Sequence, residues 1–370
     1  MLSQNIKYLP AIDILRGFAA LLVVLYHGFH LFSYQLSYHQ SFQFDHWPHS
    51  LNPLTTLLIE GHTAVTLFMV TSGFIFTFGN LKKTRLDYRY FIYNRILRIY
   101  PLMLLIIATA LALHPDQFAL WPLLKTLGLM ANTQGALTIE PFTSMFWTIA
   151  VEFQFYLIFP LLLRLLQKKG PSALIALICL ATIARWIAVY IGDANPRDLS
   201  YWTIAGRIDQ FLMGMLVGWY LLKREKPSRD TARLFLIYGL LSPLLVCWTL
   251  NQAGGWPIVS TWKIFFPPIE ALAWSTTIVG LLYAKWPCNR LVTAFQRIGE
   301  SSYSIYMQHM LYLSAITLYL AKNQPKITVS PQLYALSITL LALIPICAHA
   351  HLTYQFVEKP FLKLRQKYNN

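Results

Sequence analysis

The sequence predicts an all-α integral membrane protein, a polytopic bundle of about ten transmembrane helices with both termini in the cytoplasm. Three observations support this fold class. Hydrophobic residues make up 56% of the 370 residues and charged residues only 12%, whereas about a quarter of an ordinary soluble domain is charged. Apolar segments of roughly 20 residues, long enough to cross a bilayer as helices, recur along the chain. Lysine and arginine collect in alternate connections between these segments.

The apolar segments define the expected helices one by one. In chain order their expected bounds are 12–32, 62–79, 96–113, 146–166, 172–191, 207–222, 234–250, 265–284, 302–321 and 333–354. Hydrocarbon offers no water to backbone groups, so each segment is expected to be a helix with an internally paired backbone. Segment 118–131 is shorter and contains Pro122 and Lys125, which favours an interfacial or re-entrant position over a crossing.

The formal net charge of +15 would suggest a nucleic-acid partner for a soluble protein, but here its distribution predicts topology. Connections 33–61 and 251–262 hold few or no basic residues. The basic residues follow every second apolar segment: Lys82, Lys83, Arg85, Arg89, Arg95, Arg98, Arg164, Lys168, Lys169, Lys223, Arg224, Lys226, Arg229, Arg233, Lys285, Arg290, Arg297, Lys359, Lys363, Arg365 and Lys367. The positive-inside rule therefore places both termini in the cytoplasm, and membrane lipid rather than nucleic acid is the expected partner.

Cysteine usage gives little indication of function. Cys179, Cys247 and Cys347 lie in predicted spans and Cys288 lies in a predicted cytoplasmic connection. This arrangement provides neither a paired external set for disulfides nor the spacing of a metal site, so no metal is expected.

The first apolar segment carries an arginine and a histidine on one face. Arg16 and His27 are eleven residues apart, so in a helix they fall within about 20° of the same face and about 16 Å apart along the axis. A charge inside a span costs about 3 kcal/mol on insertion scales. Taken alone, Arg16 could serve only to set the topology, and His27 could serve only as a hydrogen-bonded contact between helices. Their shared face favours a functional pair.

Two further arginines stand at the cytoplasmic entrance of the third segment. Arg95 and Arg98 are one helical turn apart, and two guanidinium forks at that spacing are suited to clamp a phosphate or diphosphate. Ordinary positive-inside bias is the alternative explanation.

Glu152 is expected near the outer end of the fourth segment, at a depth comparable with His27. There it would orient His27 or accept its proton, as an acid/base pair requires, or else neutralise Arg185 or Arg207. Arg207 is also close enough in sequence to Asp209 for an ion pair of their own.

Other polar and aromatic residues leave packing and function open. His309 is expected near mid-membrane, as a packing residue or as part of the site. The small residues around Ser72 favour close helix contact or a pocket. Trp147, Tyr156 and an aromatic-rich connection offer flat faces to a sugar ring or form an interfacial belt. The residues of that connection are Tyr34, Tyr38, Phe42, Phe44 and Trp47.

Taken in order, these elements resemble those of membrane acyltransferase family 3, whose members transfer acyl groups to extracytoplasmic sugars and related acceptors. The resemblance runs from end to end of the chain. One element is the pair Arg16 and His27, separated by ten residues in the first segment. The others are Phe68–Phe74, Arg95-x-x-Arg98-x-x-Pro101, Trp147–Glu152, Gly299–His309 and Val357-Glu358-Lys359-Pro360.

The resemblance implies ten core helices in one membrane acyltransferase domain over residues 1–370, with acetyl-coenzyme A as acyl donor. It makes His27 catalytic, assigns Arg16, Arg95 and Arg98 to the donor, and implies the stand-alone type without a fused extracytoplasmic hydrolase-like domain. Together with the residue analysis it predicts an O-acetyltransferase of the bacterial inner membrane that acetylates an extracytoplasmic or lipid-linked carbohydrate, alone or with an extracytoplasmic partner.

The expected site follows from both lines of reasoning. His27 and Glu152 are the expected catalytic residues, and Ser72, Trp147, Tyr156 and His309 are expected to line the substrate pocket. His27 would deprotonate the acceptor hydroxyl or carry the acetyl group transiently. The alternative is a proton-coupled carrier of a small acidic or sugar-like solute, although the sequence shows no repeated half and no paired Gly/Pro-broken helices at matching positions.

Overall fold

The computed structural model describes residues 9–225, 227–284 and 289–368. All regular secondary structure in these ranges is helical. Lys226, Lys285 and Cys288, which were expected in cytoplasmic connections, lie outside the described residues.

Each of the ten predicted spans corresponds to one long helix. These helices are α1 (Pro10–Tyr38), α3 (Thr63–Asn80), α4 (Tyr88–Leu113), α6 (Phe146–Lys169), α7 (Pro171–Tyr190), α9 (Ile204–Lys223), α10 (Arg229–Gln252), α11 (Phe266–Tyr283), α13 (Ser302–Asn323) and α14 (Pro331–Thr353). Short helices connect them: α2 (Pro53–Ile59), α5 (Leu120–Leu127), α8 (Pro196–Trp202), α12 (Arg290–Glu300) and α15 (Lys359–Leu362). Single turns of other helix types cover Pro115–Gln117, Thr261–Ile264 and Tyr354–Glu358.

Seven helices in the described part of the chain are long and apolar enough to cross a membrane: α1, α3, α4, α6, α7, α10 and the α14 region as far as Leu362. The protein is therefore an integral membrane protein. The other three predicted spans, α9, α11 and α13, are also at least 18 residues long. They are more polar because they carry buried groups such as Asp209, Glu270 and His309 that bond inside the bundle.

Segment 118–131 forms the short helix α5, whose eight residues rise only about 12 Å. It is too short to cross a bilayer. Trp121 is 75% exposed, and the Lys125 ammonium donates to the Gln134 carbonyl at 3.0 Å. The expectation that this segment does not cross the membrane agrees with its length.

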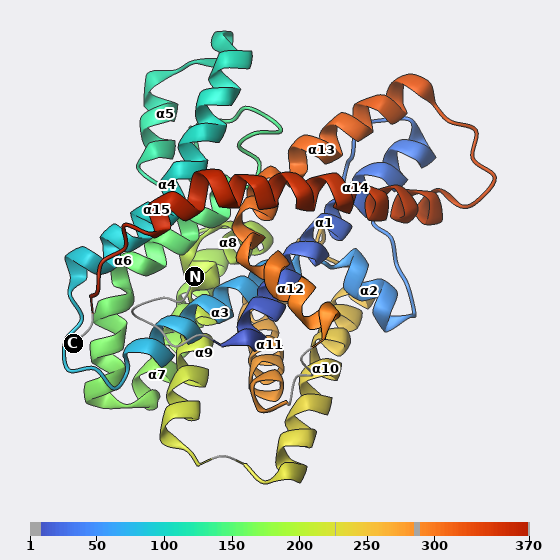
Figure 1. The fold of residues 1–370 in the computed structure, drawn as a ribbon. Helices are drawn as coiled ribbons and strands as arrows, with labels where there is room; N and C mark the ends of the chain where they lie inside the picture. The colour runs from blue at the N-terminus through green and yellow to red at the C-terminus, as the bar shows by residue number, and fades with distance from the viewer. Residues whose placement is uncertain (1–8, 226, 285–288, 369–370) are drawn as a thin grey trace.

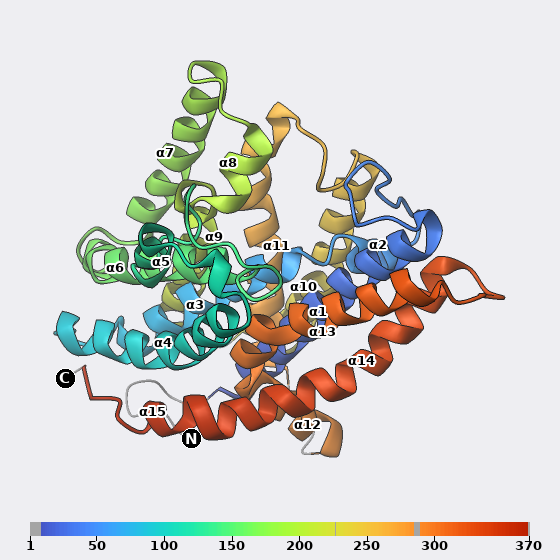
Figure 2. The same ribbon diagram turned by 90° about the horizontal axis from the view of Figure 1, so that it is seen from above.

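The helices form a bundle in which elements distant in sequence lie together. Helices α1, α13 and α14 run side by side, as both ribbon views show (Figures 1 and 2). Helix α3 packs along α9, and α10 packs along α11. The long α1 thus carries Arg16 and His27 on one continuous helix that the two C-terminal long helices flank.

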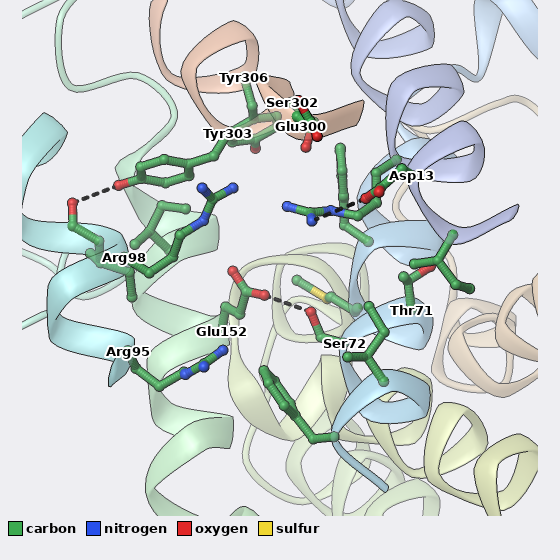
Figure 3. A pocket seen from close by; sticks show the side chains of 18 of the residues that line it. Asp13, Thr71, Ser72, Arg95, Arg98, Glu152, Glu300, Ser302, Tyr303 and Tyr306 are labelled. Atoms are coloured by element: carbon green, nitrogen blue, oxygen red, sulfur yellow. Dashed lines mark hydrogen bonds and ion pairs between the residues drawn. The ribbon is translucent and has the colours of Figure 1, made fainter. Parts of the chain in front are cut away.

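Glycines bring α3 and α9 into backbone contact. A Cβ added at Gly73 would lie 2.0 Å from the carbonyl oxygen of Phe211, and one added at Gly214 would lie 2.0 Å from that of Val70. Only hydrogen fits at these positions, which is the usual device of close membrane helix packing. Gly73 therefore serves helix contact, whereas its neighbour Ser72 points toward a cavity (Figure 3).

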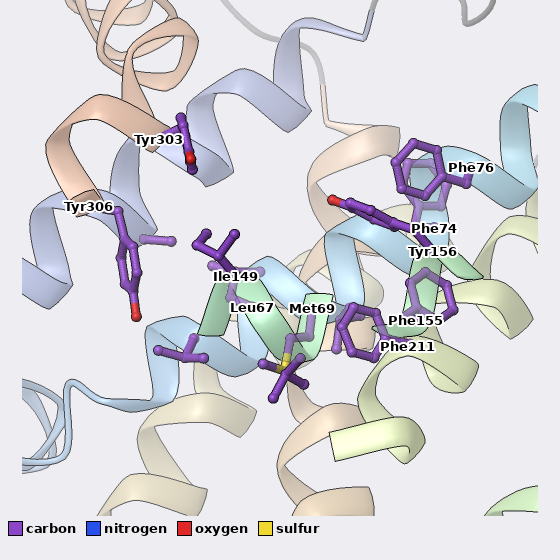
Figure 4. Packing of buried hydrophobic residues seen from close by; sticks show 14 of the residues in the cluster. Leu67, Met69, Phe74, Phe76, Ile149, Phe155, Tyr156, Phe211, Tyr303 and Tyr306 are labelled. Atoms are coloured by element: carbon purple, nitrogen blue, oxygen red, sulfur yellow. The ribbon is translucent and has the colours of Figure 1, made fainter. Parts of the chain in front are cut away.

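The apolar core lies against α3, α6 and α9. The rings of Phe155 and Phe211 stack at 4.1 Å between centroids, and Tyr156 meets Phe76 edge to face at 5.3 Å (Figure 4). This packing fixes the rotation of α6, so that Glu152 and Tyr156, one turn apart, are presented to the cavity.

An irregular segment enters the bundle before α6 begins. Between α5 and α6 the side chains of Leu137 and Ile139 are buried. Their backbone N–H groups donate to the hydroxyls of Thr126 and Thr143, each at 2.9 Å. Non-helical backbone is tolerated at membrane depth only where such partners are supplied. Helix α6 therefore starts within the bundle, where Met145 and Phe146 are buried.

We predict that Gly73→Ala destabilises the fold by about 1–3 kcal/mol, because the new methyl group would meet a backbone carbonyl that cannot rotate away. A lower midpoint of thermal unfolding in detergent would show this. Ala184→Val is the control, since Ala184 is exposed on α7 and should tolerate added volume. Equal midpoints for Gly73→Ala and the parent protein would contradict the proposed helix contact.

Candidate active site

A cavity of about 340 Å³ opens between α1, α3, α4, α6, α13 and the segment that follows α14. Its size is at the lower end of ligand pockets in proteins. We call it the arginine pocket, because Arg16, Arg95, Arg98 and Arg365 all line it. Figure 3 shows Arg95 and Arg98 reaching in from α4, with Glu152 between them and Ser72.

Arg95 and Arg98 confirm the expected spacing of one helical turn on α4. The Arg95 guanidinium lies 4.7 Å from the centroid of the Phe76 ring and 5.8 Å from that of Tyr156. Its buried Nε atom has no hydrogen-bond partner among the described residues. Such a cation, held by aromatic faces and with an unused donor, is prepared for an anion.

Arg98 has a carboxylate partner that sequence reasoning missed. Arg98 donates to Glu358 at 2.5 Å, and the Ser304 hydroxyl donates to the other oxygen of the same carboxylate. Glu358 closes a π-helical turn at Tyr354–Glu358, a kind of turn that is common at functional sites. The Val-Glu-Lys-Pro element therefore anchors one wall of the arginine pocket.

Arg16 lines the same pocket and lies 3.9 Å from Asp13, one turn earlier on α1. Its side chain keeps 28% of its surface exposed. Because α1 is continuous from Pro10 to Tyr38, the rise of about 16 Å from Arg16 to His27 is preserved. The arginine pocket and His27 thus lie at two levels of one helix.

The structure does not place Glu152 against His27, contrary to expectation. Glu152 accepts a hydrogen bond of 2.6 Å from the Ser72 hydroxyl and lines the arginine pocket. None of the described contacts of His27 involves it. The expectation failed because α6 directs Glu152 toward Ser72 of α3, whereas His27 faces His309 of α13.

His27 instead pairs with His309 of α13. Their facing ring nitrogens, His27 Nδ1 and His309 Nε2, are 3.2 Å apart. His309 Nδ1 lies 2.8 Å from the Tyr306 carbonyl oxygen, so Nδ1 carries the proton in the neutral ring and Nε2 is an acceptor. This brings together two residues that the sequence singled out separately.

The hydrogen-bond network assigns the tautomer of His27. Its Nδ1 faces two acceptors, His309 Nε2 and the Val23 carbonyl oxygen at 3.0 Å, so Nδ1 must be the protonated nitrogen. The Nε2 lone pair is then available to act as a base or nucleophile. Among the described residues no hydrogen bond engages that atom.

Tyr306 links the arginine pocket to the histidine pair. Its side chain lines the pocket, and its ring centroid lies 5.9 Å from that of His309. The His309 ring is in turn 5.1 Å from the ring of His27. Helix α13 therefore connects the arginine pocket, through Tyr306, with the histidine pair, through His309.

Beyond His27 lies a continuous series of aromatic rings. Centroid distances are 4.8 Å from His27 to Tyr26, 5.9 Å from Tyr26 to His62, 5.6 Å from His62 to Tyr201 and 5.1 Å from Tyr201 to Trp147. We call these rings, with Trp47, Trp202 and Trp256, the aromatic cluster. Trp147 belongs to this cluster and not to the arginine pocket, whereas Tyr156 and Ser72 belong to the pocket.

A buried carboxylate holds the aromatic cluster together. Glu60 accepts hydrogen bonds from Trp47 at 2.7 Å, Asn251 at 2.9 Å and the Trp256 backbone at 3.1 Å. Burial alone raises the pKa of Glu60, but hydrogen bonds from its partners, His62 first among them, outweigh burial and lower it. Glu60 thus remains ionised and ties the loops of Trp47 and Trp256 to the end of α10.

Two buried ion pairs correct the sequence interpretation of Arg185 and Arg207. Arg185 bonds Asp209 at 2.6 Å, and Arg207 lies 3.9 Å from Glu270 of α11. Arg207 and Asp209 do not pair with each other, because residues two apart on a helix face different directions. Neither arginine is neutralised by Glu152, so both pairs serve the scaffold.

Sequence reasoning also missed Arg365, Lys363 and Tyr303 as residues of the arginine pocket. The two basic residues had been counted only toward topology. Tyr303 donates to the Ile99 carbonyl at 2.9 Å and lies under Arg98 at 5.1 Å. Within the described residues there is no group of three His, Cys, Asp or Glu side chains arranged to hold a metal ion.

A membrane helix bundle with a cationic pocket below a histidine pair has the form of a group-transfer site. A family model described as an acyltransferase domain, acyltransferase family 3, matches residues 9–351. The chain belongs to this family.

Similar curated proteins come from Staphylococcus aureus. O-acetyltransferase OatA is 25% identical over an alignment of 395 positions that includes gaps and covers 96% of this chain and 58% of OatA. A second protein, provisionally named an O-acetyltransferase, is 23% identical over 394 residues, 97% of this chain and 58% of its own. The chain thus spans somewhat over half the length of these relatives. No solved structure matches it.

We predict that Asp209→Asn lowers the free energy of unfolding by about 3–5 kcal/mol, because it leaves the Arg185 guanidinium buried without its counter-ion. Thermal unfolding in detergent measures the effect. The control is Asp230→Asn, which removes an exposed partner of Arg233 and should leave the midpoint unchanged. If both variants have the same midpoint of thermal unfolding as the parent protein, the Arg185–Asp209 pair does not stabilise the fold.

Proposed function

We propose that this protein is a membrane-bound O-acetyltransferase that moves an acetyl group from cytoplasmic acetyl-coenzyme A to a hydroxyl of an extracytoplasmic or lipid-linked carbohydrate. The observation that carries the proposal is the alignment, along one helix bundle, of the arginine pocket, the His27–His309 pair and the aromatic cluster. Membership of the acyltransferase family and the similarity to O-acetyltransferases support the reaction class.

The arginine pocket fits the phosphates of coenzyme A. Its guanidinium groups present forked donors to oxyanions, and Arg95 and Arg365 have no carboxylate partner within 4 Å among the described residues. The flexible pantetheine arm would cover the rise of about 16 Å toward His27. In this proposal the diphosphate would lie at Arg16, Arg95 and Arg98 and the thioester near the histidine pair.

The histidine pair supplies the chemistry. In one route His27 Nε2 takes the proton of the acceptor hydroxyl while the oxygen attacks the thioester carbonyl and coenzyme A leaves as the thiol. In the other, Nε2 attacks the thioester carbonyl, the C–S bond breaks and coenzyme A leaves as the thiolate; the acceptor oxygen then takes the acetyl group from Nε2, and the hydroxyl proton goes to the thiolate. His309 acts in both as a positioning residue, because its Nε2 accepts the His27 Nδ1–H and keeps the reactive nitrogen free.

Glu152 has a different task from the one first expected. Bonded to Ser72, it would orient that hydroxyl within the arginine pocket and balance the charge of Arg16. Its place in the pocket supports a role in donor binding.

The aromatic cluster is the proposed acceptor surface. Flat rings such as those of Trp147 and Trp202, which remain partly exposed, suit the apolar faces of sugars, and the cluster begins directly beside His27. The topology proposed with it has ten crossings, with α9, α11 and α13 added to the seven apolar helices, both termini in the cytoplasm, and the bacterial inner membrane as location.

The direct test is thiol release from acetyl-coenzyme A by the purified protein in lipid. We predict release that depends on added surface glycan, with acetyl esters detected on that glycan by mass spectrometry. His27→Gln should slow it by about 10²- to 10⁴-fold, the usual contribution of a general acid or base. His351→Gln, exposed on α14, is the control. Full activity of a folded His27→Gln protein would refute the mechanism.

We predict that Arg95→Gln raises the KM for acetyl-coenzyme A about tenfold or more and leaves kcat nearly unchanged, since one charge-assisted contact to the donor is lost. Steady-state kinetics at saturating acceptor measure both constants. Arg89→Gln, an exposed position on the same helix, provides the matched control. A KM that stays at the parent value would reduce Arg95 to a topology signal.

A further inference from the structure

The segment after α15 is tied across the start of α4 as a strap, which we define as residues 363–368. The side-chain amide of Asn94 donates to the Gln366 carbonyl at 2.7 Å and accepts from the Gln366 N–H at 2.9 Å. The Asp87 N–H donates to the Tyr368 carbonyl at 2.8 Å, and the Tyr368 ring meets Phe91 edge to face at 5.4 Å. Asn94 is fully buried, so the strap is a fixed part of the fold.

This attachment holds Arg365 over the arginine pocket. The Arg365 side chain lines the cavity, and its buried Nε has no hydrogen-bond partner among the described residues. Burial, followed by the positive charges of Arg95 and Arg98, lowers the pKa of Arg365 to about 9. A guanidinium held among other guanidinium groups, with an unused donor, is stabilised by an anion.

The strap places Arg365 beside Arg95. Gln366, the next residue after Arg365, is bonded to Asn94, the residue before Arg95, and Arg98 lies about one helical turn further along α4. Arg365 therefore lies at the end of the pocket nearest the start of α4, which we call its mouth. In the proposed topology this end is cytoplasmic, whereas His27 lies toward the opposite side.

The chemistry of the donor determines which group reaches this mouth. In coenzyme A the thioester is at one end, the diphosphate is between, and the 3′-phosphate of the adenosine is at the other end. With the thioester at His27 and the diphosphate at Arg95 and Arg98, the 3′-phosphate falls at the mouth.

We propose that Arg365, held by the strap, binds the 3′-phosphate of the donor and makes the pocket selective for coenzyme A over its 3′-dephospho form. This inference rests on the proposed function, because it requires the coenzyme A donor. A guanidinium fork matches a terminal phosphate with paired hydrogen bonds.

The test is calorimetric binding of coenzyme A and of 3′-dephospho-coenzyme A to the full-length protein in lipid nanodiscs. The parent protein should bind coenzyme A about tenfold or more tightly than the dephospho form. Arg365→Gln should lose that preference by weakening coenzyme A alone. Lys367→Gln is the matched control, because this strap residue is exposed and lies outside the cavity lining. Arg365→Lys keeps the charge without the fork and should give an intermediate preference.

The outcomes separate this inference from the proposed function. If the parent protein binds both forms equally, or if a folded Arg365→Gln protein weakens both to the same extent or neither, the assignment to the 3′-phosphate is overturned while the donor stands. If the parent protein binds neither form, the donor itself is wrong and the assignment falls with it. Should Arg365→Gln not fold, equal preference in Arg365→Lys and the parent protein would overturn the assignment.

Discussion

Unneutralised guanidinium charge inside a membrane bundle is the constraint on which the rest of this structure depends. Charged side chains at membrane depth persist where they find partners or line a polar cavity. Arg185 and Arg207 find acidic partners, Asp209 and Glu270. The arginines of the arginine pocket line a polar cavity instead. Within 4 Å among the described residues, carboxylates pair with Arg16 and Arg98 but not with Arg95 or Arg365, so the pocket retains cationic groups that an anionic donor would satisfy.

The rest of the fold places reactive groups relative to that pocket. Backbone contact at Gly73 and Gly214 locks α3 to α9, which leaves Ser72 on the cavity side. The continuous α1 sets the separation between Arg16 and His27. Helix α13 then supplies both Tyr306, which lines the pocket, and His309, which fixes the tautomer of His27.

Sequence reasoning succeeded where periodicity and local spacing decide structure. It located the ten long helices found in the described part of the chain and the spacing of Arg95 and Arg98. It failed where the position of a side chain depends on contacts between helices that are distant in sequence. The partner of Glu152 is Ser72 of α3, and this pairing depends on how α6 packs against α3, which no periodic pattern shows. The partner of Asp209 lies on α7, and helix geometry alone already excludes Arg207 two residues away.

Residues in the C-terminal region were the hardest to place from the sequence. The role of Glu358 depends on a π-helical turn, and that of Arg365 on a non-helical strap tied to Asn94. Neither feature follows from hydrophobic pattern. The pairing of His27 with His309 joins residues 282 positions apart, so the sequence could nominate both but not show that one sets the protonation of the other.

The central claim is that the donor enters at the arginine pocket on the cytoplasmic side and the acceptor is acetylated on the opposite side. Sealed membrane vesicles of both orientations test it, with acetyl-coenzyme A added outside and acceptor glycan enclosed. Inverted vesicles, which expose the cytoplasmic face, should release thiol at once, and right-side-out vesicles only after permeabilisation. Equal release from both kinds of sealed vesicle, or release from right-side-out vesicles alone, would contradict the account.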